Sequence, residues 1–178
     1  MCGIAGIVDW GQSRPNMVRR DAVESMTRRM AFRGPDDGGI WQSDDGACTL
    51  GHRRLSILDL SPLGHQPMVA PGGQVLTFNG EIYNYRRLRP ALEDRGWRFI
   101  STSDTEVLLA GLVLEGPDFI QRLDGMYAFA LWDPAARTLL AARDPFGEKP
   151  FYLCRQGQML GFASELDCLS QLPGFDDR

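Results

Sequence analysis

The sequence predicts a layered α+β domain, and three observations lead to this prediction. The chain has 178 residues, which is the usual length of one compact domain. Hydrophobic residues make up 43% of it and charged residues 24%, as in globular chains that bury a core. Strand-like segments are interleaved with three helical segments. We expect the helices to cover sheets in layers, as opposed to a closed barrel.

Each element is predicted from its local pattern. Short apolar runs bounded by turn-forming residues indicate strands, and apolar residues three and four positions apart indicate helices. Strands are expected at 3–10, 40–42, 47–50, 74–78, 97–101, 126–132, 138–142, 151–153 and 159–163. Helices are expected at 15–32, 83–95 and 104–114, with a short helical segment at 165–169. The last four strands suggest a meander in the second half of the chain.

Turn-forming residues separate these elements. Pro15 lies at the expected start of the first helix. The segment 33–39 (RGPDDGG) and the glycine pair at 72–73 indicate turns. Residues 171–178 become polar and contain Pro and Gly, as at a domain boundary. We therefore expect residues 1–178 to form one domain.

Charge and motif content exclude several classes of function. The net charge is −4 and no block of like charge occurs, so nucleic acid is not expected as a partner. No apolar run approaches the roughly 18 residues of a membrane span and no signal peptide is evident, which predicts a cytoplasmic protein without membrane contact. The four cysteines and two histidines lack metal-site spacing, and no glycine-rich phosphate loop is present. We expect neither a metal site, a disulfide nor a nucleotide site.

Cys2 is the first candidate for chemistry. Removal of Met1 would leave a thiol and a free α-amine on the same residue. The amine has a reference pKa of about 7.7 to 8.0, so near neutral pH it can accept the thiol proton. The other cysteines, Cys48, Cys154 and Cys168, are expected to act as small apolar side chains.

The pair Asn79-Gly80 has two interpretations. Asn-Gly between apolar segments is a strong signal for a hairpin turn. Alternatively, the Asn amide and the Gly backbone N–H form an oxyanion hole, since two such donors can converge on a developing negative charge. The sequence pattern is compatible with both.

Two further charged positions could bind an amino acid. Ser103 to Glu106 matches a capping box, which leaves Asp104 in the first helical turn as a fixed anion for an ammonium group. Arg53 and Arg54 are adjacent in a strand-like segment, so only one of them can face a given pocket. An arginine there is either solvated at the surface, which is the commoner case, or a bidentate partner for a carboxylate.

Longer motifs resemble a known family over nearly the whole chain. They are MCGIAG at the start, RGPDD at 33–37, HRRLSILDLSPLGHQPM at 52–68, FNGEIYNY at 78–85, SDTEVLLAG at 103–111, LDGMYAFALWD at 123–133, RDPFGEKP at 143–150 and FASE at 162–165. The chain thereby resembles the N-terminal glutaminase domain of glutamine-dependent asparagine synthetase, a class II glutamine amidotransferase. The resemblance implies the N-terminal-nucleophile hydrolase fold, a four-layer αββα sandwich with two mostly antiparallel sheets.

The resemblance also implies roles for six residues. Three would act in catalysis: Cys2 as the nucleophile, with its α-amine as base, and Asn79 with Gly80 as the oxyanion hole. Three would bind L-glutamine: Arg54 its α-carboxylate, and Asp104 with Glu81 its α-ammonium group. Arg54 is chosen over Arg53 because the family arginine directly precedes the LSI segment.

The implied reaction cleaves the glutamine side-chain amide through a thioester and releases ammonia, without a cofactor in this domain. ATP and Mg would be needed only by a synthetase domain, which uses the ammonia to make asparagine from aspartate. That domain lies outside this sequence, in cis or in trans. Alternatives are a domain of the same fold that serves a different ammonia acceptor, or a non-catalytic docking module, against which Cys2 argues. The sequence leaves a homo-oligomer open.

Overall fold

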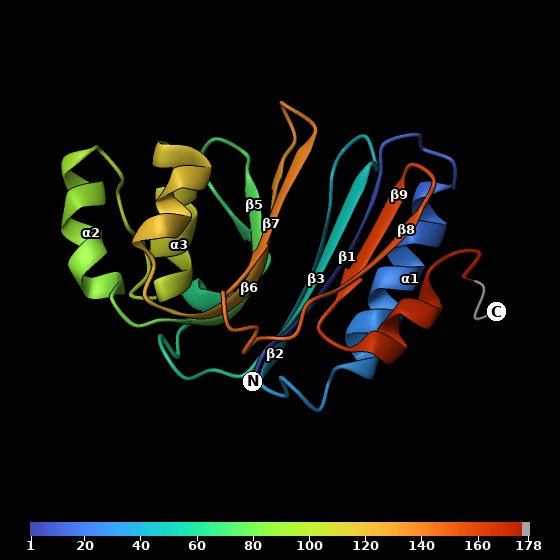
Figure 1. Cartoon of the computed structure of the whole chain (residues 1–178), viewed down its shortest axis with the longest axis horizontal. Coiled ribbons are helices and arrows are strands. Elements are labelled where there is room, and N and C mark those ends of the chain that lie inside the picture. The colour runs from blue at the N-terminus through green and yellow to red at the C-terminus, as the bar shows by residue number, and fades with distance from the viewer. Residues whose placement is uncertain (176–178) are drawn as a thin grey trace.

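The computed structural model describes residues 1–175, which fold into two antiparallel β-sheets that face each other. Helices α2 and α3 lie on the outer side of one sheet and α1 lies on the outer side of the other (Figure 1). The layers therefore follow the order α, β, β, α, which confirms the expected sandwich. The end of the predicted polar segment, 176–178, lies outside the described residues.

Within residues 1–175, five strands form the first sheet, in the order β2-β3-β1-β9-β8, and four form the second, in the order β4-β5-β6-β7. The first sheet contains β1 (Gly3–Asp9), β2 (Asp37–Gln42), β3 (Cys48–Arg54), β8 (Tyr152–Gln156) and β9 (Met159–Ala163). The second contains β4 (Met68–Val69), β5 (Val75–Ile82), β6 (Gly125–Asp133) and β7 (Thr138–Arg143). The last four strands thus do not form one meander, because β8 and β9 join the first sheet.

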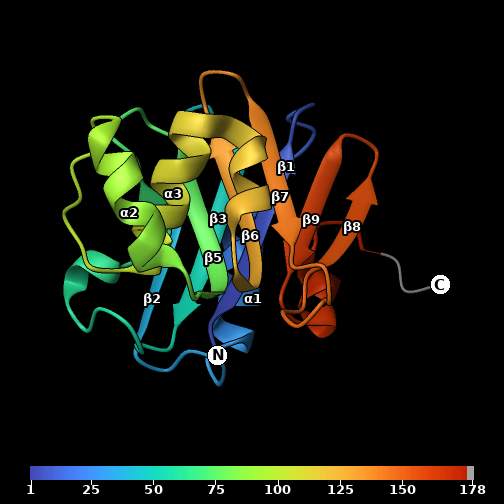
Figure 2. The ribbon, with the colours of Figure 1, turned by 60° about the vertical axis from the view of Figure 1, so that its left-hand side comes forward.

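Helices cover both outer faces. The α-helices are α1 (Asn16–Arg29), α2 (Tyr85–Asp94) and α3 (Asp104–Glu115), and the short 3₁₀ helices are η1 (Pro62–Gly64), η2 (Gly116–Arg122) and η3 (Leu166–Gln171). Figure 2 shows α2 and α3 side by side over the second sheet. No helix of the described residues is long and apolar enough to cross a membrane.

The core between the sheets is tightly packed. Leu50 of the first sheet and Trp132 of the second belong to one buried apolar cluster, together with Phe162. A Cβ at Gly6 would lie 2.4 Å from the ring of Phe162, so β1 needs glycine at this position. Burial on both faces explains why β1 reads as a continuous apolar run.

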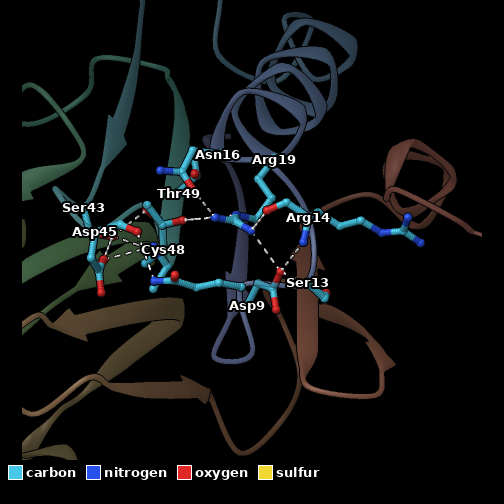
Figure 3. A network of polar contacts seen from close by, with 12 residues as sticks. Asp9, Ser13, Arg14, Asn16, Arg19, Ser43, Asp45, Cys48 and Thr49 are labelled. Carbon is cyan, nitrogen blue, oxygen red and sulfur yellow. Dashed lines mark hydrogen bonds and ion pairs between the residues drawn. The ribbon is translucent and has the colours of Figure 1, made fainter.

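A buried ion pair ties α1 to the first sheet. Arg19 of α1 and Asp9 at the end of β1 are both fully buried, and their side chains lie 2.9 Å apart. Arg19 also donates to the carbonyl of Gly46 and to the side chain of Asn16, which joins the helix to the turn before β3 (Figure 3). This network fixes the position of α1 relative to β1.

Two predictions from local pattern are wrong. Asn79-Gly80 is not a hairpin turn, because both residues lie inside β5 and pair with Ala128 and Tyr127 of β6. The strand expected at 97–101 is an irregular segment instead. The N–H groups of Ile100 and Ser101 donate to the Glu106 carboxylate, so they do not enter a sheet ladder.

Candidate active site

A cavity of about 270 Å³ lies where the N-terminal residues, β3, β5 and the start of α3 meet. All six residues to which sequence analysis assigns roles line it: Cys2, Arg54, Asn79, Gly80, Glu81 and Asp104. They come from four separate segments of the chain, and both sheets contribute. In Figure 1 the N-terminus lies at the lower end of the two sheets.

The Cys2 thiol is held at the wall of this cavity. Its sulfur lies 3.5 Å from the N–H of Leu55 and 3.7 Å from the Leu55 carbonyl. Arg33 donates from Nε to the Cys2 carbonyl at 2.8 Å, which fixes the backbone of the residue. Burial raises the pKa of the Cys2 thiol, an effect that the Leu55 hydrogen bond and the nearby positive charges only partly offset. The thiol therefore needs a base to become a nucleophile near neutral pH.

The Asn79 side chain is buried without a partner. It is 1% exposed, and among the described residues neither its Oδ1 nor its Nδ2 makes a hydrogen bond. An unpaired buried amide costs free energy in the folded protein, and such groups are rare. Because Asn79 lines the cavity, its amide is available to a bound molecule.

The backbone N–H of Gly80 is directed away from β6. In an antiparallel strand the N–H groups of alternate residues point to the same edge. The Phe78 N–H donates to Gln66 Oε1 at 2.7 Å and the Ile82 N–H donates to Asp104 Oδ2 at 2.9 Å, so neither pairs with β6. The Gly80 N–H lies between them on that edge, beside the cavity.

The two adjacent arginines of β3 face different sides, as strand alternation predicts. Arg54 lines the cavity and donates to the carbonyls of Ser61 at 3.1 Å, Leu58 at 3.4 Å and Asp59. Arg53 donates to the Gly34 carbonyl at 2.9 Å and lines a separate groove beside α1. Arg54 is thus the arginine that can reach a ligand in this cavity.

Asp104 is a buried carboxyl group at the start of α3. It is 5% exposed and accepts a hydrogen bond from Ile82. Burial raises its pKa to about 6, although backbone N–H groups of Ile82 and Thr105 favour the charged form. The carboxylate is therefore ionised at neutral pH, but the helix terminus does not fully offset its desolvation.

Only one of the two hydrogen bonds of the predicted capping box forms. Ser103 Oγ accepts from the Glu106 N–H at 3.2 Å, as expected for an N-cap. The Glu106 carboxylate does not accept from the backbone N–H of Ser103. It accepts instead from Ser101 N at 2.7 Å and from Ser101 Oγ at 2.6 Å. This arrangement anchors the segment before Asp104 to α3.

Sequence reasoning assigns no role to three other residues at the site. Arg33 holds the Cys2 carbonyl, Gln66 supports Phe78 next to Asn79, and Lys149 lines the cavity with 6% exposure. All three lie within the motifs that carry the family resemblance. Lys149 is also the only lysine of the chain, a signal that could have marked it.

The chain is similar to known proteins over its whole length. Residues 1–178 match a family model described as a glutamine amidotransferase domain. The chain is 38% identical to glutamine-hydrolysing asparagine synthetase 3 of Bacillus subtilis, with 100% of this chain and 29% of the relative covered. It is 40% identical to asparagine synthetase B of Escherichia coli, with 95% and 30% covered. The chain thus spans less than a third of these two relatives.

A solved structure has the same fold. It is glutamine phosphoribosylpyrophosphate amidotransferase from B. subtilis, with a TM-score of 0.75 and 24% identity over 95% of this chain and 43% of that chain. The fold of this amidotransferase is thus consistent with the family model that matches the chain. The chain therefore belongs to the glutamine amidotransferase family, as a glutaminase domain of the type found in asparagine synthetases.

Proposed function

We propose that this domain hydrolyses the side-chain amide of L-glutamine in the Cys2 cavity and supplies the ammonia for asparagine synthesis. One observation carries the proposal. A single cavity is lined by a thiol, an unpartnered buried amide, a guanidinium group and a buried carboxylate. These groups match a nucleophile, an oxyanion donor and the two charges of an amino acid.

Glutamine would be held by its two charged groups. Arg54 binds the α-carboxylate, and Asp104 with Glu81 binds the α-ammonium group. Charges of both signs in one cavity discriminate against amides that lack the amino-acid end, because such ligands leave the buried Asp104 carboxylate without a positively charged partner. The side-chain amide then extends toward Cys2.

The proposed reaction forms and breaks one thioester. Once Met1 is removed, the Cys2 α-amine takes the thiol proton, and the thiolate attacks the amide carbon. Asn79 Nδ2 and the Gly80 N–H donate to the developing oxyanion. The protonated α-amine of Cys2 then gives its proton to the departing nitrogen of the side-chain amide, which leaves as ammonia. Water then attacks the thioester, which yields glutamate and restores the thiol. This scheme uses no metal or cofactor.

The ammonia acceptor belongs to the proposal as well. The relatives that support it are named as glutamine-hydrolysing asparagine synthetases, and this chain covers less than a third of each. We propose that a synthetase domain, in cis or in trans, binds ATP and aspartate and consumes the ammonia. A domain that serves another acceptor would use the same glutamine site.

The test is glutamine hydrolysis by purified protein whose mass shows that Met1 has been removed. We expect equal amounts of glutamate and ammonia from the wild type and no turnover from Cys2→Ala. Cys154→Ala is the matched control, because it also removes a thiol but lies on β8 and does not line the cavity. It should retain activity.

Retention of Met1 should also abolish turnover, because the nitrogen of residue 2 is then an amide without basicity near neutral pH. Turnover by Cys2→Ala at the wild-type rate would disprove the nucleophile. Turnover by protein that is shown by mass to retain Met1 would disprove the role of the α-amine.

A further inference from the structure

The loop of residues 55–64 forms one wall of the glutamine cavity but has little apolar anchorage. Leu55, Leu58 and Gly64 line the cavity. In contrast, the side chains of Leu60 and Leu63 are 79% and 50% exposed. Few apolar contacts therefore hold this loop, and its position depends on polar contacts.

The side chain of Arg54, at the end of β3, is hydrogen-bonded to this loop. Its guanidinium group donates to three carbonyls of the loop, those of Leu58, Asp59 and Ser61. A guanidinium group has five N–H donors, so three such contacts leave two N–H groups for a carboxylate ligand. The position of the loop therefore sets where the guanidinium group of Arg54 lies.

Asp59 joins the loop to the segment before α3. Its Oδ2 accepts from the Thr102 N–H at 2.8 Å and from Thr102 Oγ1 at 3.1 Å. Its Oδ1 accepts from the N–H of Ser61 at 3.0 Å and from the Ser61 hydroxyl. One carboxylate thus binds a cavity wall on one side and, on the other, a residue two positions before Asp104.

The backbone of Asp59 supports the same interpretation. Its φ angle is +45°, in the left-handed region that non-glycine residues rarely adopt, although Asp tolerates it better than most. The hydrogen bonds from Ser61 and Thr102 lower the pKa of Asp59 to about 2, so the carboxylate is ionised at neutral pH. The contact with Thr102 is therefore charge-assisted.

We infer that Asp59 is a positioning residue for substrate binding: it sets the spacing between the Arg54 guanidinium and the Asp104 carboxylate, and so determines the affinity for α-amino acids. This inference rests on the proposed function, because it assumes that Arg54 and Asp104 bind the two ends of glutamine. Asp59 itself is not among the residues that line the cavity. Its effect passes through Arg54, because its carboxylate binds Ser61, whose carbonyl accepts a hydrogen bond from Arg54.

The experiment uses Asp59→Gly and Asp59→Asn. Glycine accepts the left-handed backbone and removes the carboxylate, so it separates the side-chain contact from backbone strain. We expect Asp59→Gly to raise the KM for glutamine at least tenfold and to change kcat less than threefold. Asp59→Asn keeps an acceptor without the charge and should give an intermediate KM. Asp45→Ala, which removes the carboxylate of another turn far from the cavity, is the matched control and should leave KM unchanged.

A double-mutant cycle tests whether Asp59 acts through Arg54. In an Arg54→Ala background, Asp59→Gly should change KM less than twofold, since the group that it positions is gone. Full additivity of the two substitutions, an equal loss in kcat, or a KM within twofold of the wild type for Asp59→Gly would each overturn the inference.

Direct binding separates this inference from the proposed function. Calorimetric titration of L-glutamine into Cys2→Ala protein measures affinity without turnover. Absence of binding in this protein would overturn both the proposed function and the inference. Binding that Asp59→Gly does not weaken would overturn the inference alone. A tenfold weaker binding would support both.

Discussion

The Asp104 carboxyl group destabilises the folded protein at neutral pH, and it is also the charge that we propose binds the α-ammonium group of glutamine. Its pKa is raised from 3.8 to about 6 because burial disfavours the charged form. A group with a raised pKa contributes most to stability at pH values below its unfolded pKa, and that contribution is lost as the pH rises through the folded pKa. Asp104 is therefore least favourable to folding above pH 6.

Asp104→Asn should stabilise the protein and impair binding. One pKa unit corresponds to about 1.4 kcal/mol, so the gain in unfolding free energy at pH 8 should approach about 3 kcal/mol, and it should disappear only at pH values below the unfolded pKa of 3.8. The Asn oxygen can still accept from the Ile82 N–H. Thermal unfolding from pH 4 to pH 8 measures this, with Asp21→Asn on the exposed surface of α1 as control.

The same variant should raise the KM for glutamine at least tenfold, because loss of a charged, desolvated partner typically costs about 2 to 5 kcal/mol. For the wild type, the affinity for glutamine should fall as the pH drops through 6, when Asp104 becomes protonated. A variant less stable than the wild type at pH 8, or one with unchanged KM, would contradict this account of Asp104.

At the scale of elements, β5 carries the two proposed oxyanion donors and approaches β6 closely at Gly80. A Cβ at this position would lie 2.3 Å from the Met126 carbonyl oxygen and 2.8 Å from Tyr127 Cα. Both atoms belong to the backbone of β6, which cannot move aside as a flexible side chain can. Glycine here is required by the strand pairing, not by a turn.

Gly80→Ala should therefore displace β5 where it borders the cavity. Overpacking of this kind costs about 1 to 3 kcal/mol of stability, and kcat should fall more than stability alone explains. Denaturant unfolding and glutamine turnover measure the two effects. Gly11→Ala is the matched control, since the atoms nearest to its Cβ would belong to the flexible side chain of Gln158, at 3.3 Å and beyond. Equal stability and equal kcat of the two variants would show that the close approach at Gly80 does not matter for activity.

At the scale of the whole molecule, the site exists only where the two sheets meet. Cys2 directly precedes β1 and Arg54 is the last residue of β3, both in the first sheet, whereas Asn79 lies in the second sheet and Asp104 in the helix that covers it. Packing between the sheets, through residues such as Trp132 and Phe162, therefore sets the distance between Cys2 and the cavity residues of the second sheet. Glutamine should stabilise the domain as a whole.

The 178-residue chain should respond to glutamine but not to the substrates of a synthetase. A ligand stabilises only the protein that binds it, by about 2.7 kcal/mol at a hundredfold excess over its Kd. In Cys2→Ala protein, glutamine should raise the thermal midpoint, and ATP with aspartate should leave it unchanged. In the wild type, these additions should yield no asparagine. An ATP-dependent shift would reveal a nucleotide site within this chain.

The sequence alone predicted the structure correctly where the local hydrophobic pattern and the motifs agree. The apolar run of β1, the helix of α3 and the alternation of Arg53 and Arg54 follow from burial and periodicity, which any short window of sequence contains. The motifs also identify six residues that line one cavity, although their chemical roles stay predictions.

Tertiary structure decided what depends on distant partners. Asn79-Gly80 satisfies the local rule for a turn, yet pairing of all eight residues of β5 with β6 overrides it. The segment 97–101 has strand-like composition, but its N–H groups bind Glu106. The raised pKa of Asp104 and the contact of Asp59 with Thr102 likewise arise from burial and from contacts across 22 and 43 residues of sequence. Such contacts form only when separate segments pack together, so no local window of the sequence contains them.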